Sequence, residues 1–316
     1  MSPIDRDDIE LLARHSDWAP RDIRTTLGRE VYAGEKDWQR LLQYLLLGAG
    51  AAFLLSGIVF FFAYNWAELP RLVKIGTVTG LFTLTGLFGI FAPVGRQARN
   101  VALTAAVGLI GIVMAVLGQV YQSGADSYQL FLGWTLLAVP WVAVVYFSPL
   151  WLLFVGLLNV TFLTYVAQRG LYEELIVTGL LLFLLNVALW GIHYLLWRGR
   201  GSFGWLLKLI ALWTAVIATI NLSAGALDDK WGQLGLMLLV AGLTYAGWAW
   251  LGLRQRSIFY PAVVGSSSLI TFVFLFIRLT DGEIGMIFLA GLLALGGMTL
   301  LAHHLNQLNR RWHGQQ

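Results

Sequence analysis

The chain has 316 residues, of which 58% are hydrophobic and 12% charged, so it is not a soluble globular protein, in which about a quarter of residues are charged. Its net charge of +4 comes from basic residues spread among short loops, a distribution that argues against a nucleic-acid partner and for a lipid bilayer. Cysteine is absent and the five histidines have no metal-ligand spacing, which excludes disulfides and thiolate sites, and we expect no metal or other cofactor.

Residues 1–40 are predicted to form a short cytoplasmic amphipathic helical hairpin. The segment Ser2–Asp5 has the form of a capping box, so a first helix is expected to begin there. A second helix carries Ile23, Leu27 and Val31 on one apolar stripe. Two helices this short cannot hold a core of their own, so the stripe should face the membrane domain, the lipid or a partner, unless the segment is only a solvated anchor that sets the topology.

Apolar runs of about 20 residues, each long enough to cross a bilayer as a helix, follow one another through residues 41–305. We therefore expect an all-α polytopic membrane protein with about ten transmembrane helices. The tightest boundary between two spans rests on Pro149, because proline suits the first turn of a helix. The predicted spans cover residues 41–64, 71–92, 99–121, 128–147, 149–168, 173–197, 203–223, 231–253, 257–278 and 284–305.

Ten spans can be divided into two five-helix halves of opposite orientation, an arrangement that recurs in secondary transporters. Pro140 and Pro261 are predicted kinks, and they would occupy similar places in the two halves. Lipid supplies no hydrophobic force for helix association, so glycines are expected to pack helices closely. The GxxxG pattern Gly76–Gly80 and three glycines of the last span, Gly291, Gly296 and Gly297, are candidates for such contacts.

The basic residues also predict the orientation in the membrane. Most of the 21 lysines and arginines fall on the side that holds both termini, whereas every acidic residue beyond residue 40 falls on the other side. Because positively charged loops stay in the cytoplasm, we expect a multi-pass protein of the bacterial inner membrane with a cytoplasmic N-terminus and C-terminus. The last residues, 306–316, would form a cytoplasmic tail.

The middle of each predicted span contains no acidic residue, and Lys208 lies near enough to an inner end to reach the interface. Coupled transporters commonly keep an ionisable group at the membrane centre, so its absence argues against ion-driven transport. The neutral polar residues of the spans favour interhelical hydrogen bonds over a solute path. They are Asn159, Thr161, Thr164, Asn186, His193 and Asn221.

Two polar stretches are predicted to lie on the outer side, FFFAYNWAELPRL before the second span and LGQVYQSGADSYQLF between the third and fourth. Their aromatic, amide and carboxylate groups could bind a polar or cationic ligand, or a protein partner, on one common surface. The same residues also suit interfacial aromatics, helix caps and a turn, so a purely structural role stays open. The candidate surface consists of Tyr64, Asn65, Trp66, Glu68, Gln119, Tyr121, Gln122 and Asp126.

The motifs AYNWAELPRLVK, at Ala63–Lys74, and GQVYQSGADSYQLFLGW, at Gly118–Trp134, resemble those of an uncharacterised bacterial family of predicted inner-membrane proteins, a domain of unknown function. The resemblance extends from about Trp18 to Trp151, and the later spans are similar only in character. It implies no established activity and no catalytic residues. It does imply companions, because family members are often encoded beside a second multi-span protein and a membrane-anchored protein with a GDYxxLxxY motif.

Residues and resemblance together favour a non-enzymatic inner-membrane component of an envelope complex, with membrane proteins encoded nearby as partners. The alternative is a small-molecule transporter or exporter of the ten-helix drug and metabolite type, without an intramembrane carboxylate. An enzyme is disfavoured, because the sequence shows no Ser/His/Asp arrangement, no metal-ligand spacing and no carboxylate pair at membrane depth.

Overall fold

The computed structural model describes residues 18–27, 66–171, 175–197, 204–227, 231–280 and 282–313, together with isolated positions between 34 and 64. The chain divides into two compact units, Met1–Lys74 and Ile75–Gln316, and each is described by itself. In the first unit, α2 (Pro20–Thr26) begins where Asp22 accepts a hydrogen bond from Ala19 N–H at 3.1 Å. The first helix of the predicted hairpin and most of the span 41–64 lie outside the described residues.

In the described part of the chain, nine helices are long and apolar enough to cross a membrane. They are α4 (Arg71–Phe91), α5 (Arg96–Tyr121), α6 (Ser127–Val144), α7 (Ser148–Arg169), α8 (Leu175–Trp197), α9 (Gly204–Leu227), α10 (Trp231–Arg254), α11 (Phe259–Leu279) and α12 (Ile284–His313). Each coincides with a predicted span, which confirms the all-α polytopic membrane fold.

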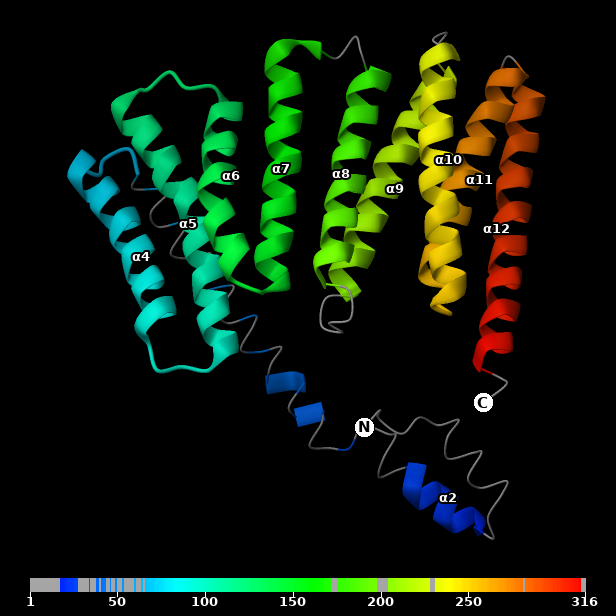
Figure 1. The fold of residues 1–316 in the computed structure, drawn as a ribbon, viewed down its shortest axis with the longest axis horizontal. Coiled ribbons are helices and arrows are strands. Elements are labelled where there is room, and N and C mark those ends of the chain that lie inside the picture. Colours follow the sequence, from blue (N-terminus) through cyan, green and yellow to red (C-terminus); the bar gives the residue numbers. More distant parts are fainter. Residues whose placement is uncertain are drawn as a thin grey trace. The chain divides into compact units, whose positions relative to one another are not determined.

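Successive helices of the second unit run in alternating directions (Figure 1). As a result, the loop between α5 and α6 lies at the opposite end of the helices from the end of α12 (Figure 1). The end of α7 and the start of α8 lie at the same end of the helices as the α5–α6 loop (Figure 1). The loop between α10 and α11 lies at the end at which α12 finishes.

The structure confirms the helix boundary predicted at Pro149 and contradicts the kink predicted at Pro261. Pro149 lies in the first turn of α7, which confirms the boundary between α6 and α7. Pro140 lies inside α6, where its missing N–H interrupts the helical hydrogen bonds. Pro261, however, is the third residue of α11, and the first turn of a helix has no intrahelical acceptor for its N–H groups. The predicted kink at Pro261 is therefore wrong, and the two prolines do not occupy matching places.

At its C-terminal end the chain stays helical beyond the apolar run. The last span is predicted to end at residue 305, and the helix that contains it, α12, continues to His313. Thr299 and His303 form local side-chain hydrogen bonds within this helix, to Leu295 O at 2.8 Å and with Gln307 at 2.9 Å. Residues 306–313 are thus a polar extension of α12.

Most of the glycines predicted to pack closely against another helix do not, and other glycines do. A Cβ atom at Gly76, Gly80, Gly291 or Gly296 would meet no atom within 4 Å among the described residues. By contrast, a Cβ at Gly297 would lie 2.5 Å from Leu269 Cδ1, so this one of the predicted glycines does pack against another helix. Still closer approaches occur at Gly111, which Trp134 covers, and at Gly179, which Asn221 covers.

Neutral polar residues join the helices in the membrane interior. Asn159 and Asn186 donate to each other's Oδ1 atoms, at 3.1 and 2.7 Å, and Trp213 Nε1 also donates to Asn159 Oδ1 at 3.1 Å. These three side chains connect α7, α8 and α9. The hydroxyls of Thr135 and Thr161 are 3.1 Å apart and connect α6 to α7.

A second group of polar side chains connects α9, α10 and α11. Ser267 Oγ on α11 lies 2.6 Å from both Thr219 Oγ1 on α9 and Tyr245 Oη on α10. By contrast, Thr164 donates to the Val160 and Thr161 carbonyls of its own helix, and His193 packs edge-on against Trp151 with ring centroids 5.4 Å apart. Most of the predicted polar residues therefore support packing between helices.

Candidate functional site

The polar stretch Gly118–Ser127 forms a tight corner between α5 and α6. Gln122 adopts the left-handed conformation with φ 45° as the C-cap of α5, and its N–H donates to Gly118 O. Ser123 N–H donates to the same carbonyl at 3.1 Å. Gly124 is also left-handed, with φ 63°, a conformation that glycine adopts without steric cost. The corner is therefore a defined turn rather than an extended loop.

Asp126 begins the next helix. It is the N-cap of α6 and forms a capping box with Gln129, whose Oε1 accepts a hydrogen bond from Asp126 N–H at 3.1 Å. Its Oδ1 also accepts a hydrogen bond from Gln168 Nε2 on α7 at 2.9 Å. The expectation that Asp126 caps a helix is thus confirmed, and the same carboxylate connects the corner to α7.

An open hollow of about 720 Å³ lies at this corner. It is formed by a single stretch of chain that includes the last turns of α5, the turn itself and the first turn of α6. Among the predicted surface residues, Gln119, Tyr121 and Asp126 line it, and Gln122 does not. Ser123 and Ser127 add hydroxyl groups to the lining. The hollow therefore offers amide, hydroxyl, carboxylate and aromatic groups within one small volume.

The remainder of this motif has a packing role. Trp134 Nε1 donates to Val107 O on α5 at 2.8 Å, and its ring stacks with Phe131 at a centroid distance of 6.3 Å. The indole covers Gly111 so closely that a Cβ there would lie 2.2 Å from the ring. Below the hollow, the motif LFLGW thus fixes α6 against α5.

The other predicted motif belongs to the first compact unit. Lys74 Nζ lies 5.3 Å from the Trp66 ring centroid, a cation–π contact that spans the turn before α4. Pro70 O accepts hydrogen bonds from the N–H groups of Val73 and Lys74, which starts the helix. Tyr64 and Glu68 are exposed, and Asn65 lies outside the described residues. A common surface of the two motifs stays a prediction.

Groups that could hold a metal ion do not gather in the described part of the chain, where no three His, Asp or Glu side chains come together. The hollow itself contains one carboxylate, Asp126, which is already engaged by Gln168. Its chemistry is that of hydrogen bonding and aromatic contact.

Comparison with known proteins identifies the N-terminal part of the chain. Residues 24–151 match the model of a family described as "Predicted membrane protein (DUF2157)". This segment, which is less than half of the chain, is similar to that family. The match contains both polar motifs and ends in the first turn of α7. No curated protein and no solved structure matches the chain.

Three residues at the end of α7 were missed by sequence reasoning, and all lie beyond the matched residues 24–151. Gln168 binds Asp126, and Tyr165 packs edge-on against Tyr128 with ring centroids 5.6 Å apart. Arg169 lies over the Tyr165 ring at 5.6 Å. One signal could have indicated them: α6 and α7 form an antiparallel hairpin, so the end of α7 returns to the start of α6.

Proposed function

We propose that the protein is a non-enzymatic subunit of an envelope membrane complex, and that the hollow at residues 114–130 binds a partner on the outer side of the inner membrane. The observation that carries this proposal is the hollow itself, which Gln119, Tyr121 and Asp126 line and which lies within the matched residues 24–151. A corner with two left-handed residues and a capping box is stiff, and a preorganised surface loses little entropy on binding.

The charge distribution supports the outer location. The helix ends opposite the hollow carry a group of arginines. Because positively charged segments stay on the cytoplasmic side, those ends should be cytoplasmic. These arginines are Arg96, Arg99, Arg254, Arg256, Arg310 and Arg311. With this orientation the end of α12 is cytoplasmic, the hollow is outside, and companion membrane proteins encoded nearby are the expected partners.

Contacts in the membrane interior favour a subunit over a transporter. A solute path needs polar groups that face a common channel, but Asn159, Asn186 and Trp213 satisfy one another. Thr219, Ser267 and Tyr245 do the same. Polar groups consumed by interhelical hydrogen bonds stabilise a bundle and leave little to bind a passing solute.

Replacing Gln119 by Ala is expected to weaken the association with the partner at least about fivefold, since interface residues that matter cost more than about 1 kcal/mol when truncated. Gln119 lines the hollow on an exposed turn of α5, so its loss removes an amide contact without opening the core. The measurement is quantitative co-purification of companion membrane proteins with the tagged full-length chain in mild detergent.

Gln255→Ala is the matched control, because Gln255 is an exposed glutamine in the loop at the opposite end of the helices. It should leave co-purification unchanged. Purified protein in liposomes provides the contrary outcome: if the chain alone moves a solute and Gln119→Ala abolishes that flux, the protein is a transporter and the proposal is wrong.

A further inference from the structure

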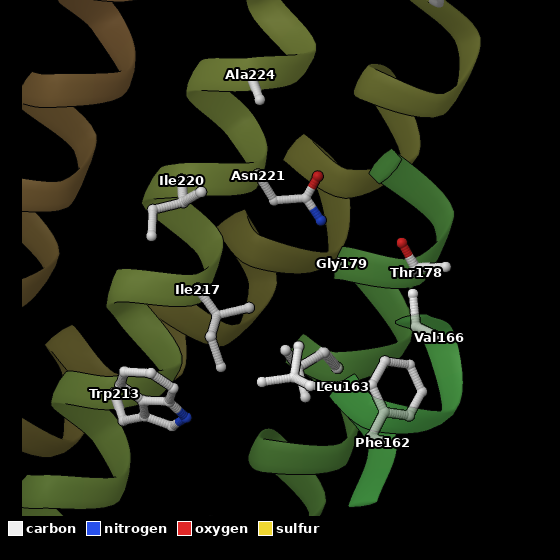
Figure 2. A pocket seen from close by; sticks show the side chains of 11 residues that line it. Phe162, Leu163, Val166, Thr178, Gly179, Trp213, Ile217, Ile220, Asn221 and Ala224 are labelled. Atoms are coloured by element: carbon white, nitrogen blue, oxygen red, sulfur yellow. The ribbon is translucent and has the colours of Figure 1, made fainter. Parts of the chain in front are cut away.

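A second cavity, separate from the hollow, lies between α7, α8 and α9 within the membrane spans. Its volume is about 300 Å³, at the lower end of the roughly 300–1,000 Å³ of small-molecule sites. Figure 2 shows Trp213, Ile217 and Asn221 of α9 on one side and Phe162 and Leu163 of α7 on the other. No charged side chain lines it, so an ionic ligand does not fit.

One polar group stands out in this apolar lining. Asn221 is buried, with 4% of its surface exposed, and its Nδ2 donates to Ile176 O on α8 at 3.2 Å. Its Oδ1 accepts no hydrogen bond from any residue that the structure describes. This oxygen is itself almost fully covered, so a donor supplied from elsewhere reaches it only when the amide turns towards the cavity. Buried acceptors in proteins nearly always have a partner, which favours such a turn when a donor is present.

The fold makes room for this amide. Gly179 on α8 faces it, and a Cβ there would lie within bonding distance of Asn221 Nδ2. Figure 2 shows the Asn221 side chain directed from α9 towards Gly179 and Thr178. The α8–α9 contact is therefore shaped around the polar end of the cavity.

The other end of the cavity is fixed by Trp213, whose Nε1 donates to Asn159 Oδ1 at 3.1 Å. Trp213 and Asn221 are eight residues apart on α9, which corresponds to about 12 Å along the helix. Leu163 and Ile220 are 46% and 64% exposed and flank the side that faces the hydrocarbon. A molecule dissolved in the bilayer can thus enter sideways between α7 and α9.

From these observations we infer that the cavity between α7, α8 and α9 binds a single-chain amphiphile, a hydrocarbon chain whose polar end carries a hydroxyl or amide donor. The donor bonds to Asn221 Oδ1, and the chain lies along α9 towards Trp213. This site is independent of the proposed partner surface, from which its lining residues are distinct.

The test uses the full-length protein in lipid nanodiscs and a decanol analogue with a photoreactive group at the chain end. Crosslinked peptides should come from the segments around Leu163 and Trp213. Decanol should compete for labelling roughly three- to tenfold better than decyl methyl ether, which has the same chain but no donor, because one neutral hydrogen bond is at stake.

Two variants separate the donor site from the cavity. Asn221→Leu should abolish the preference for decanol over the ether. Leu163→Trp keeps Asn221 and should reduce labelling by filling the cavity from a half-exposed position, whereas Leu292→Trp on the exposed face of α12 should not. Labelling spread evenly over α10 and α12, or an ether that competes as well as the alcohol in the unmodified protein, overturns the inference.

Discussion

Gly111→Ala is expected to lower the free energy of unfolding by about 1–3 kcal/mol, the usual cost of overpacking. The new methyl group would lie 2.2 Å from Trp134 Cε3. The indole has little freedom to retreat, because its Nε1 donates to Val107 O and its ring stacks with Phe131. Thermal or denaturant unfolding of the purified protein in detergent, followed by circular dichroism, measures the change.

Gly108 provides the control on the same helix. A Cβ at Gly108 would meet nothing within 4 Å among the described residues. Gly108→Ala should therefore be neutral or stabilising by up to about 1 kcal/mol, since alanine has the higher helix propensity. Equal losses from the two variants would show that Trp134 does not press on Gly111 and that the α5–α6 packing is different.

The other large effect is expected at Asn159. Asn159→Ala removes a partner of both Asn186 and Trp213. It leaves the buried Asn186 Oδ1 without its donor and the Trp213 N–H without its acceptor, which costs about 1–3 kcal/mol. Asn186→Ala should cost a similar amount. The double variant should cost clearly less than the sum of the two, because residues in one hydrogen-bond network are coupled. Unfolding of the three variants in the same detergent gives this coupling.

Thr164 on α7 is the matched control for Asn159. In the described residues its hydroxyl bonds to carbonyls of its own helix, so Thr164→Val should change the free energy of unfolding by less than about 0.5 kcal/mol. Strict additivity of Asn159→Ala and Asn186→Ala would contradict the network that joins α7, α8 and α9.

Much of the fold could be predicted because length and apolarity determine where a chain crosses a bilayer. The boundary at Pro149 followed from the steric rule for helix first turns, and it is correct. Pro261 was misjudged because the start of α11 was placed at residue 257 rather than Phe259, and a proline's effect depends on its distance from the helix start. Helix α12 continues beyond the predicted span because helix propensity continues after hydrophobicity stops.

Lateral contacts were much less predictable. Gly76 and Gly80 form a GxxxG pattern with no close neighbour among the described residues, whereas Gly111 and Gly179 lack a pattern and are closely covered. In a membrane protein the lipid-facing and the packed faces of a helix are both apolar, so hydrophobicity does not show which face contacts a neighbour. Shape complementarity decides the contact, and it cannot be read from a single sequence. The contact of Gln168 with Asp126 could not be predicted for the same reason, since it depends on how α7 packs against α6.

The central claim is that the hollow faces the outside and contacts a partner, and Ser123 tests it most directly. The chain has no cysteine, so Ser123→Cys supplies a single thiol at the rim of the hollow, and Ser257→Cys places one in the loop at the opposite end.

Intact cells and permeabilised cells are treated with a membrane-impermeant thiol crosslinker. We predict that position 123 reacts in intact cells and gives a discrete adduct with a companion membrane protein, which Gln119→Ala diminishes, whereas position 257 reacts only after permeabilisation. Reaction of position 123 only after permeabilisation, or reaction without any protein adduct, would contradict the account.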